Sequence, residues 1–402
     1  MVAFEKNKPS ISTLFFTSAG HFMNDGFMFL FPVIIDILSK IRDYPPSYLT
    51  VLFVAFYSAS TFFGLYASRM ADKGSILGRI HTGIFLISIG MAGLAYSILF
   101  SGDYALTVFS SILAGMGSGF YHPIGAAILQ RSYPDRKLGK ALGINGSMGS
   151  MGRAIFPLIF LGLAEIVGHG FSLIIFALAG LVVSAAIGLG LRVEKIGTRK
   201  ASKGMVDVIN YSIVLLTILF FVRSVSAQGM IAWIPTFLTH NKNAGIGVTL
   251  GVVLTIMYVA PILSQPLFGI LVDRLDKRFL LFLSSAGTAI SMYAYINSTG
   301  TMGLIFLSIF GFFTFSGFPL TMSLVSDYAP KGPSSLANSI VWGLGSSGGM
   351  IAGPLIAGAI ILNNYSRITL SFEVMIVLSF IVAILSLFLP KAKEKSKMPL
   401  FG

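Results

Sequence analysis

Residues 146–159 read Gly-Ser-Met-Gly-Ser-Met-Gly-Arg-Ala-Ile-Phe-Pro-Leu-Ile, and residues 343–356 read Gly-Leu-Gly-Ser-Ser-Gly-Gly-Met-Ile-Ala-Gly-Pro-Leu-Ile. At one fixed offset the two stretches share two glycines, one serine and the closing Pro-Leu-Ile. Glycine at helical spacing in an apolar segment is typical of membrane helices that pack backbone to backbone. The recurrence of the pattern indicates a chain built from two related halves.

The rest of the chain has the composition of a helical membrane protein. Hydrophobic residues make up 55% of its 402 residues and charged residues only 11%. A helix needs roughly 20 apolar residues to cross a bilayer, and the sequence contains twelve such segments. The predicted spans are 12–38, 48–68, 76–99, 104–130, 138–165, 170–191, 209–239, 246–272, 279–299, 301–326, 334–362 and 367–390. We therefore predict an all-α integral membrane protein with twelve transmembrane helices.

Two further pairs of landmarks support the division into halves. Asp25-Gly26 and Pro32 in the first span align with Gln228-Gly229 and Pro235 in the seventh. Asp72-Lys73 after the second span aligns with Asp273-Arg274 after the eighth. Parallel repeats of this kind are typical of transporters in which two bundles move around a central site. The predicted domains are a six-helix bundle at 1–192, a cytoplasmic linker at 193–208 and a second six-helix bundle at 209–402, which ends in a short basic tail.

The basic residues predict the orientation of the chain. Of its 28 lysines and arginines, 22 lie before the first span, in alternate loops or in the tail, and only four lie in the loops on the other side. Lysine and arginine accumulate on the cytoplasmic side of membrane proteins, so we expect both termini in the cytoplasm and a multi-pass protein of the plasma (cell inner) membrane. The net charge of +13 is therefore read as a topology signal, and no nucleic-acid partner is expected because the charges are scattered over short segments.

One loop carries a recognisable motif. Residues 269–278 read Gly-Ile-Leu-Val-Asp-Arg-Leu-Asp-Lys-Arg, which resembles the loop signature of the major facilitator superfamily. The first-half copy around Asp72 and Lys73 is degraded, because Ser68 replaces its glycine. The resemblance covers essentially the whole chain and implies the major facilitator fold. We expect these loops to act as cytoplasmic gates, in which a carboxylate at a helix end holds basic groups or a helix N-terminus; the predicted gate residues are Asp72, Lys73, Gly269, Asp273 and Arg274.

Two more motifs resemble a narrower family. Gly20-His-Phe-Met-Asn-Asp25 in the first span and Gly117-Ser-Gly-Phe-Tyr-His-Pro123 in the fourth are similar to the fosmidomycin-resistance exporters of bacteria and archaea. The resemblance implies export of a small compound, with antibiotic resistance as its consequence.

Four ionisable residues fall near the centres of spans: Asp25, His122, Arg153 and Arg223. An ionisable residue in mid-membrane costs about 2.5–3.5 kcal/mol on insertion scales and is a functional candidate by default. Asp36, Glu165 and Glu373 lie nearer the outer ends, where we expect water to solvate them.

We assign proton coupling to Asp25, His122 and His21, because a desolvated carboxyl and an imidazole both change charge near neutral pH. The alternative is a purely structural role: Asp25 would form an ion pair with Arg153 or Arg223, and each histidine would form a structural hydrogen bond. Fixed arginine charges favour an anionic substrate. The predicted substrate-binding residues are Arg153, Arg223, Asn24, Tyr121 and Gln228.

The predicted function is proton-coupled secondary transport by alternating access, with efflux by antiport of a small organic compound or drug, for which an anionic group is expected. The alternative is a proton symporter that takes up an organic anion or inorganic oxyanion. An enzyme is disfavoured because no catalytic constellation is visible, and a channel because the gate loops imply two closed states. We predict no cofactor and no metal site; a divalent-metal carrier built on His21 and Asp25 is an alternative that the nearby arginines disfavour. The expected partners are the substrate, protons and the bilayer, with the protein as a monomer.

Overall fold

The computed structural model describes residues 11–72, 79–100, 103–133, 135–191, 210–329, 337 and 340–391. Throughout these ranges the regular structure is helical, and twelve helices are long and apolar enough to span a membrane. The fold prediction of an all-α protein with twelve spans is therefore confirmed. The predicted linker, Lys73 and the basic tail after Lys391 lie outside the described residues.

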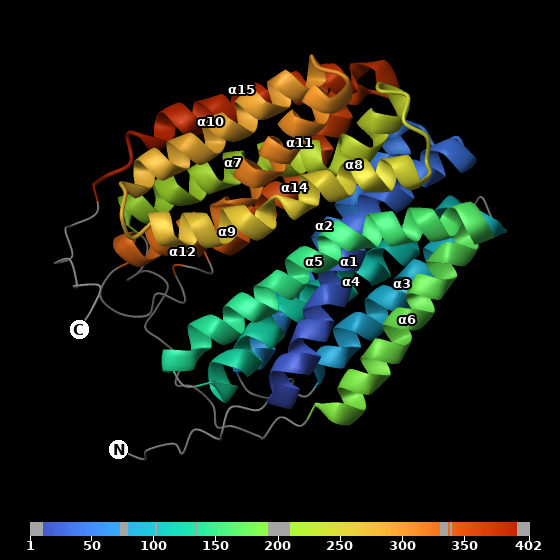
Figure 1. Ribbon diagram of the computed structural model, residues 1–402, viewed down its shortest axis with the longest axis horizontal. Helices are drawn as coiled ribbons and strands as arrows, with labels where there is room; N and C mark the ends of the chain where they lie inside the picture. Colours follow the sequence, from blue (N-terminus) through green and yellow to red (C-terminus); the bar gives the residue numbers. More distant parts are fainter. Residues whose placement is uncertain are drawn as a thin grey trace.

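The first half of the chain forms one bundle of six helices that pack on one another (Figure 1). They are α1 (Ile11–Ile41), α2 (Pro46–Asp72), α3 (Ile80–Leu99), α4 (Tyr104–Ser132), α5 (Asp135–Val167) and α6 (His169–Gly190). The start of α4 is fixed by Asp103, whose carboxylate accepts a hydrogen bond from the amide of Ala105 at 2.9 Å. Such caps satisfy amides that have no partner inside a helix.

The second half forms a second bundle, in which three spans are interrupted. Its elements are α7 (Tyr211–His240), α8 (Val248–Val259), α9 (Pro261–Leu271), α10 (Lys277–Ile296), α11 (Gly300–Phe315), α12 (Gly317–Tyr328), the π-helix η3 (Val341–Ser347), α14 (Gly348–Ile361), the short 3-10 helix η4 (Tyr365–Arg367) and α15 (Ile368–Ser386). Pro261 divides the eighth span, because proline cannot donate a backbone hydrogen bond. Ser316 separates α11 from α12 in the tenth span.

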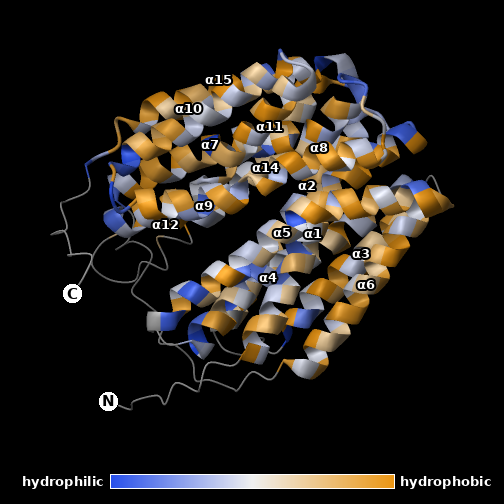
Figure 2. Cartoon of the chain, in the orientation of Figure 1, coloured by the Kyte–Doolittle hydropathy of each residue, from blue (hydrophilic) through white to orange (hydrophobic). Residues whose placement is uncertain are grey.

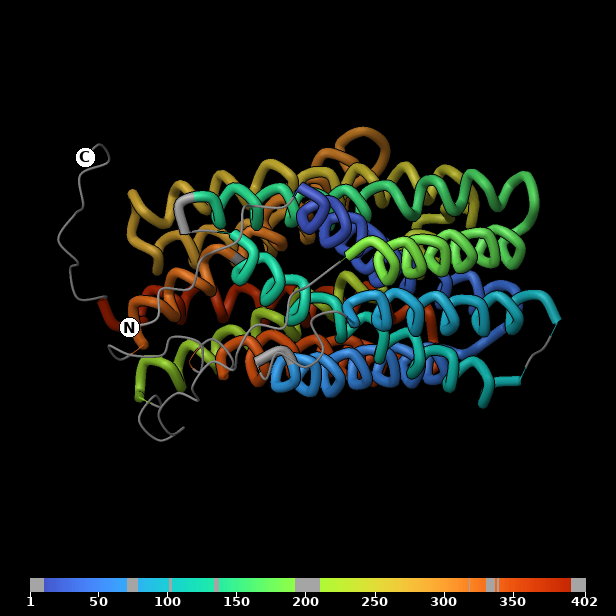
Figure 3. Tube along the Cα trace, turned by 90° about the horizontal axis from the view of Figure 1, so that it is seen from below, coloured from blue at the N-terminus to red at the C-terminus, as the bar shows by residue number. Residues whose placement is uncertain are grey.

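The helices run side by side along the long axis of the molecule, as Figure 3 shows from below. We call the end at which α1 begins and α15 ends the terminal end, and the opposite end the distal end. Hydrophobic residues cover the helices along their length, whereas hydrophilic residues gather near helix ends (Figure 2). Large apolar side chains such as Phe62, Val182 and Leu263 are about two-thirds exposed. An apolar surface of this extent suits lipid rather than water.

The two bundles meet at the distal end and diverge toward the terminal end (Figure 1). Most of the hydrogen bonds between the bundles lie near the distal helix ends. These join Asp36 to Thr239, Ser39 to His240, Ser47 to Asn363, Tyr44 to Tyr365, Glu165 to Val248 and His169 to Ile246. Nearer mid-span, Thr255 of α8 donates to the carbonyl oxygen of Ala154 of α5 at 2.7 Å.

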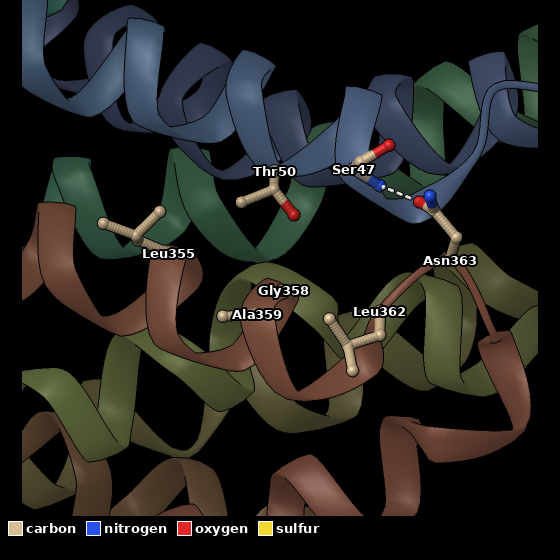
Figure 4. A pocket seen from close by; sticks show the side chains of 7 residues that line it. All are labelled: Ser47, Thr50, Leu355, Gly358, Ala359, Leu362 and Asn363. Atoms are coloured by element: carbon tan, nitrogen blue, oxygen red, sulfur yellow. Dashed lines mark hydrogen bonds between the residues drawn. The ribbon is translucent and has the colours of Figure 1, made fainter.

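Figure 4 shows one of these distal contacts, a small pocket where α2 of the first bundle meets α14 of the second. The amide of Ser47 donates to Asn363 Oδ1 at 2.8 Å. A Cβ added to Gly358 would lie 1.9 Å from Thr50 Oγ1, so only glycine allows this approach. The distal ends are therefore held together by the close approach of α14 to the Thr50 side chain as well as by hydrogen bonds.

Candidate functional site

The candidate site begins with the close packing of α1 on α5. A Cβ added to Gly152 would lie 2.1 Å from the carbonyl oxygen of Phe22, and one added to Gly149 would lie 2.5 Å from the ring of His21. These glycines belong to the repeated motif of residues 146–159. Because they let the helices touch, Arg153 of α5 comes within reach of the polar side chains of α1.

Asp25 is the centre of the resulting cluster. Arg153 Nη2 lies 3.3 Å from Asp25 Oδ2, while His122 Nε2 and His21 Nε2 lie 3.4 and 3.5 Å from Oδ1. The side-chain nitrogen Nδ2 of Asn24 donates to Asp25 Oδ1 at 3.2 Å and lies 3.4 Å from His122 Nε2. The structure thus brings together five of the predicted residues from α1, α4 and α5.

A second set of contacts holds the histidine of α1 in place. His21 Nδ1 lies 2.8 Å from Asn145 Oδ1, and Asn145 donates to the hydroxyl of Tyr121 at 3.0 Å. Tyr121 in turn donates to the carbonyl oxygen of Thr17 at 2.6 Å. Tyr121 is fully buried in this arrangement, so in this conformation its hydroxyl positions His21 through Asn145 and does not face an open cavity.

The members of the cluster differ in their access to solvent. The Asp25 side chain is 5% exposed and that of Arg153 10%, whereas the His122 side chain is 51% exposed. A proton from water therefore reaches His122 first, and Asp25 lies one contact behind it. This order suits a proton relay, because an imidazole can both accept and donate.

Aromatic rings from both bundles cover the guanidinium of Arg153. Its Cζ lies 5.1 Å from the ring centroid of Phe29 in α1 and 5.1 Å from that of Phe315 in α11. A cation over an aromatic face is favourable, more so when water is excluded. Arg153 Nε is buried and has no acceptor among the described residues. Arg153 is thus the point at which the cluster touches the second bundle, and it keeps an unused donor.

Arg223 does not join this cluster. Its Nη2 donates to Ser284 Oγ at 2.8 Å and to the carbonyl oxygens of Phe313 and Thr314 at 3.3 and 3.2 Å. The last turn of a helix leaves carbonyl groups without partners, and a cation there is favourable. Arg223 therefore satisfies the end of α11, and the alternative of an Arg223–Asp25 ion pair is not what the structure contains.

The remaining predicted residues lie apart from the cluster. Gln228 is partly buried in α7, and its neighbour Gly229 packs against Met375 and Gly353. Asp273 and Arg274 are exposed between α9 and α10, and a Cβ on Gly269 would meet nothing within 4 Å. Asp72 ends α2.

Sequence reasoning missed several polar residues. Asn145 contacts His21 at 2.8 Å, and Ser150 accepts a hydrogen bond from Arg153 at 3.3 Å. Only their position next to or inside the repeated glycine motif could have indicated them. Lys277 pairs with Asp327 of α12 near the predicted gate. The expectation that water solvates Asp36 was wrong, because this residue is completely buried.

The donor atoms of His21, Asp25 and His122 lie within 4.8 Å of one another, close enough to share a cation. Arg153 already occupies Asp25 Oδ2. A divalent ion would have to be held beside a fixed positive charge, which opposes its binding.

Comparison with known proteins identifies the fold. The model of the Major Facilitator Superfamily matches residues 15–253 and 241–400. The TsgA homolog of Buchnera aphidicola subsp. Acyrthosiphon pisum is 26% identical over 290 residues, which are 66% of this chain and 74% of that protein. TsgA of Salmonella typhi is 24% identical over 296 residues, which are 69% and 71% of the two chains.

Solved transporters share the architecture. A bacterial homolog of the human lysosomal transporter Spinster, inward-facing and occupied, superimposes with a TM-score of 0.76 at 13% identity over 95% of this chain and 97% of that one. A mutant of the nucleoside transporter NupG gives a TM-score of 0.77 at 12% identity over 94% and 100%. At these identities the likeness concerns the fold alone.

Proposed function

The chain belongs to the major facilitator superfamily of membrane transporters, and within that family we propose that it moves a small anionic compound together with protons. The observation that carries this proposal is the Asp25–Arg153 pair, placed beside two histidines and covered by Phe315 of the other bundle. The protein is a transporter and not an enzyme, so the cluster is to be understood as a binding site that two bundles expose in turn.

The charge balance of the cluster decides whether a bound proton strengthens or weakens the binding of an anion. With both histidines neutral, the charges of Asp25 and Arg153 cancel. A proton added to Asp25, His21 or His122 makes the cluster net positive by one charge, and attraction for an anion rises with that charge. By linkage, anion binding then favours proton binding. Proton and anion therefore bind together.

The geometry suggests how the proton acts. Arg153 Nη2 holds Asp25 Oδ2 at 3.3 Å, while His122 approaches the other oxygen. When Asp25 becomes neutral, or when a charged His122 competes for it, Arg153 loses its counter-ion. Its planar fork can then bind two oxygens of a carboxylate, phosphate or phosphonate. The buried and unused Nε of Arg153 supports this role.

Because proton and anion binding strengthen each other, the cluster favours the symport alternative over the efflux expected from the family resemblance. Export of an anion in exchange for protons requires that a bound proton weaken anion binding, whereas a proton bound at this cluster strengthens anion binding. With protons more concentrated outside, cotransport brings the substrate into the cell. Two bundles that meet at the distal end, with Arg153 touching Phe315 across their interface, fit an alternating-access cycle.

The experiment is flux into proteoliposomes under an imposed pH gradient, with separate tests of phosphonates, carboxylic acids, inorganic phosphate and lipophilic drugs. We expect an anionic compound to accumulate on the side toward which protons flow. Accumulation of an anion on the opposite side would overturn cotransport and restore the efflux prediction. Transport restricted to uncharged or cationic drugs would overturn the anionic class.

A further inference from the structure

A second buried carboxyl group lies far from the Asp25 cluster. Asp36 is eleven residues further along α1, which places it about 16 Å away along the helix at 1.5 Å per residue. Its side chain has no exposed surface, although it sits near the distal end, where helices approach water. The cause is α7, which packs against this face of α1 and belongs to the other bundle.

The carboxyl group of Asp36 bridges the two bundles. Its Oδ1 accepts a hydrogen bond from the hydroxyl of Thr239 at 2.8 Å, and the hydroxyl of Thr236 faces it from the same helix. Its Oδ2 is buried and has no partner among the described residues, and neither has the hydroxyl oxygen of Thr236. The hydroxyl of Thr236 can donate to an ionised carboxylate or accept from a neutral carboxylic acid, so the charge of Asp36 is decided by its burial and by the cations around it.

The surrounding groups do not supply a counter-ion. On α1 itself Lys40 is exposed one turn further on, and Asp43 is exposed in the following loop. From α7 comes His240, whose Nε2 lies 3.2 Å from the hydroxyl of Ser39. From η4 comes Tyr365, which stacks on His240 and donates to the carbonyl oxygen of Tyr44. In the described part of the chain, no lysine, arginine or histidine forms an ion pair with Asp36.

A carboxylate that is removed from water without a cation is strongly disfavoured, and such a group is neutralised instead. The neutral acid carries a donor on one oxygen. The protonated oxygen of Asp36 can donate to the Thr236 hydroxyl while the Thr239 hydroxyl donates to the other oxygen. A single proton thus removes the unpaired charge and gives both Oδ2 and the Thr236 oxygen a hydrogen-bond partner. When the distal ends separate, Asp36 meets water and the ionised form becomes favourable.

We propose that Asp36 is a second proton-binding site, and that the proton it binds holds the distal ends of the two bundles together. The proton comes from water at the distal end as the bundles close and returns there when they open. This inference concerns the gate and goes beyond the proposed function, since it needs neither the anionic substrate nor the role of Asp25. Acidic conditions should therefore favour the closed distal end.

The test measures distances between spin labels at the distal end. The natural chain has no cysteine, so Tyr48→Cys on α2 and Leu362→Cys after α14 give an unambiguous pair of exposed labels, one in each bundle. In the otherwise unchanged protein, without substrate, we expect the fraction of long distances to rise as pH increases from about 5 to 8. In Asp36→Asn, which mimics the neutral acid, the distance should stay short over the whole range. A pH response that persists in Asp36→Asn would overturn the proposal.

Three further variants sharpen the result. Glu373→Gln removes an exposed carboxylate near the distal end of α15 and should leave the response intact. His240→Gln should also retain it; loss of the response in this variant would assign the titration to the histidine and overturn the proposal. Thr239→Val removes the hydroxyl that stabilises the ionised carboxyl, so the midpoint of opening should move to higher pH. An unchanged midpoint in Thr239→Val would contradict the proposal even if Asp36→Asn failed to fold.

Discussion

Arg153 of α5 and Arg223 of α7 contact the same turn of α11, although they come from different bundles. Arg153 lies over the ring of Phe315, and Arg223 donates to the carbonyl oxygens of Phe313 and Thr314. Only Arg153 reaches a carboxylate, Asp25. The turn precedes the break at Ser316, so Asp25 lies two contacts away from the interrupted tenth span.

The first prediction concerns proton coupling. Asp25→Asn removes the carboxylate on which Arg153 and both histidines converge, so proton-driven accumulation should be abolished. Exchange of substrate at equal pH should survive, because Arg153 remains to bind the anion. Flux assays with and without a pH gradient separate the two activities, and undiminished pH-driven flux in the mutant would remove Asp25 from the coupling role. Glu373→Gln serves as a control for loss of a carboxylate in the other bundle.

The second prediction distinguishes the two arginines by stability. Arg153→Gln should destabilise the protein by about 3–5 kcal/mol, the range for removing one partner of a buried pair, because Asp25 is left charged and buried. Adding Asp25→Asn should restore most of that loss. Arg223→Gln should not be rescued by Asp25→Asn, since its partners are Ser284 and two carbonyl groups. Thermal melting of the four purified variants in detergent provides the comparison, and equal rescue of both arginine mutants would contradict the observed pairing.

The third prediction tests the helix contact that builds the site. Gly152→Ala places a Cβ against the backbone of Phe22, which cannot move aside, and should cost about 1–3 kcal/mol through overpacking. The same change at Gly139 of α5 should have little effect, because a Cβ there meets nothing within 4 Å. Substrate binding should fall together with the melting temperature in the first variant only. Equal behaviour of the two variants would show that the α1–α5 approach does not depend on this glycine.

The fourth prediction concerns the loops that resemble gates. Asp273→Asn should weaken closure of the terminal end more than Asp72→Asn, because the second loop retains the fuller sequence signature. In the present conformation Asp273 is exposed, so the effect should appear in the state with the terminal end closed. Spin-label distances between Tyr66→Cys on α2 and Leu344→Cys on η3, two exposed positions in different bundles, measure that closure. Equal opening by the two mutants would show that the first-half loop is no weaker.

Much of the site could be predicted from the sequence because charge inside a membrane is rare and costly. Asp25, His122 and Arg153 stand out in apolar spans, and His21 lies one helical turn from Asp25. The pairing of Arg153 rather than Arg223 with Asp25 could not be predicted in this way. It depends on which face of each helix meets its neighbour, and Gly149 and Gly152 determine that for α1 and α5.

The twelve spans could be predicted from the sequence alone, because hydrophobic length acts locally along each helix, and glycine spacing indicated the repeat. The burial of Asp36, by contrast, depends on how distant helices pack. Near a helix end it reads as a residue that water solvates, and its local sequence gives no sign otherwise. It is buried because α7, some two hundred residues later in the chain, packs over it and supplies Thr239 in place of water.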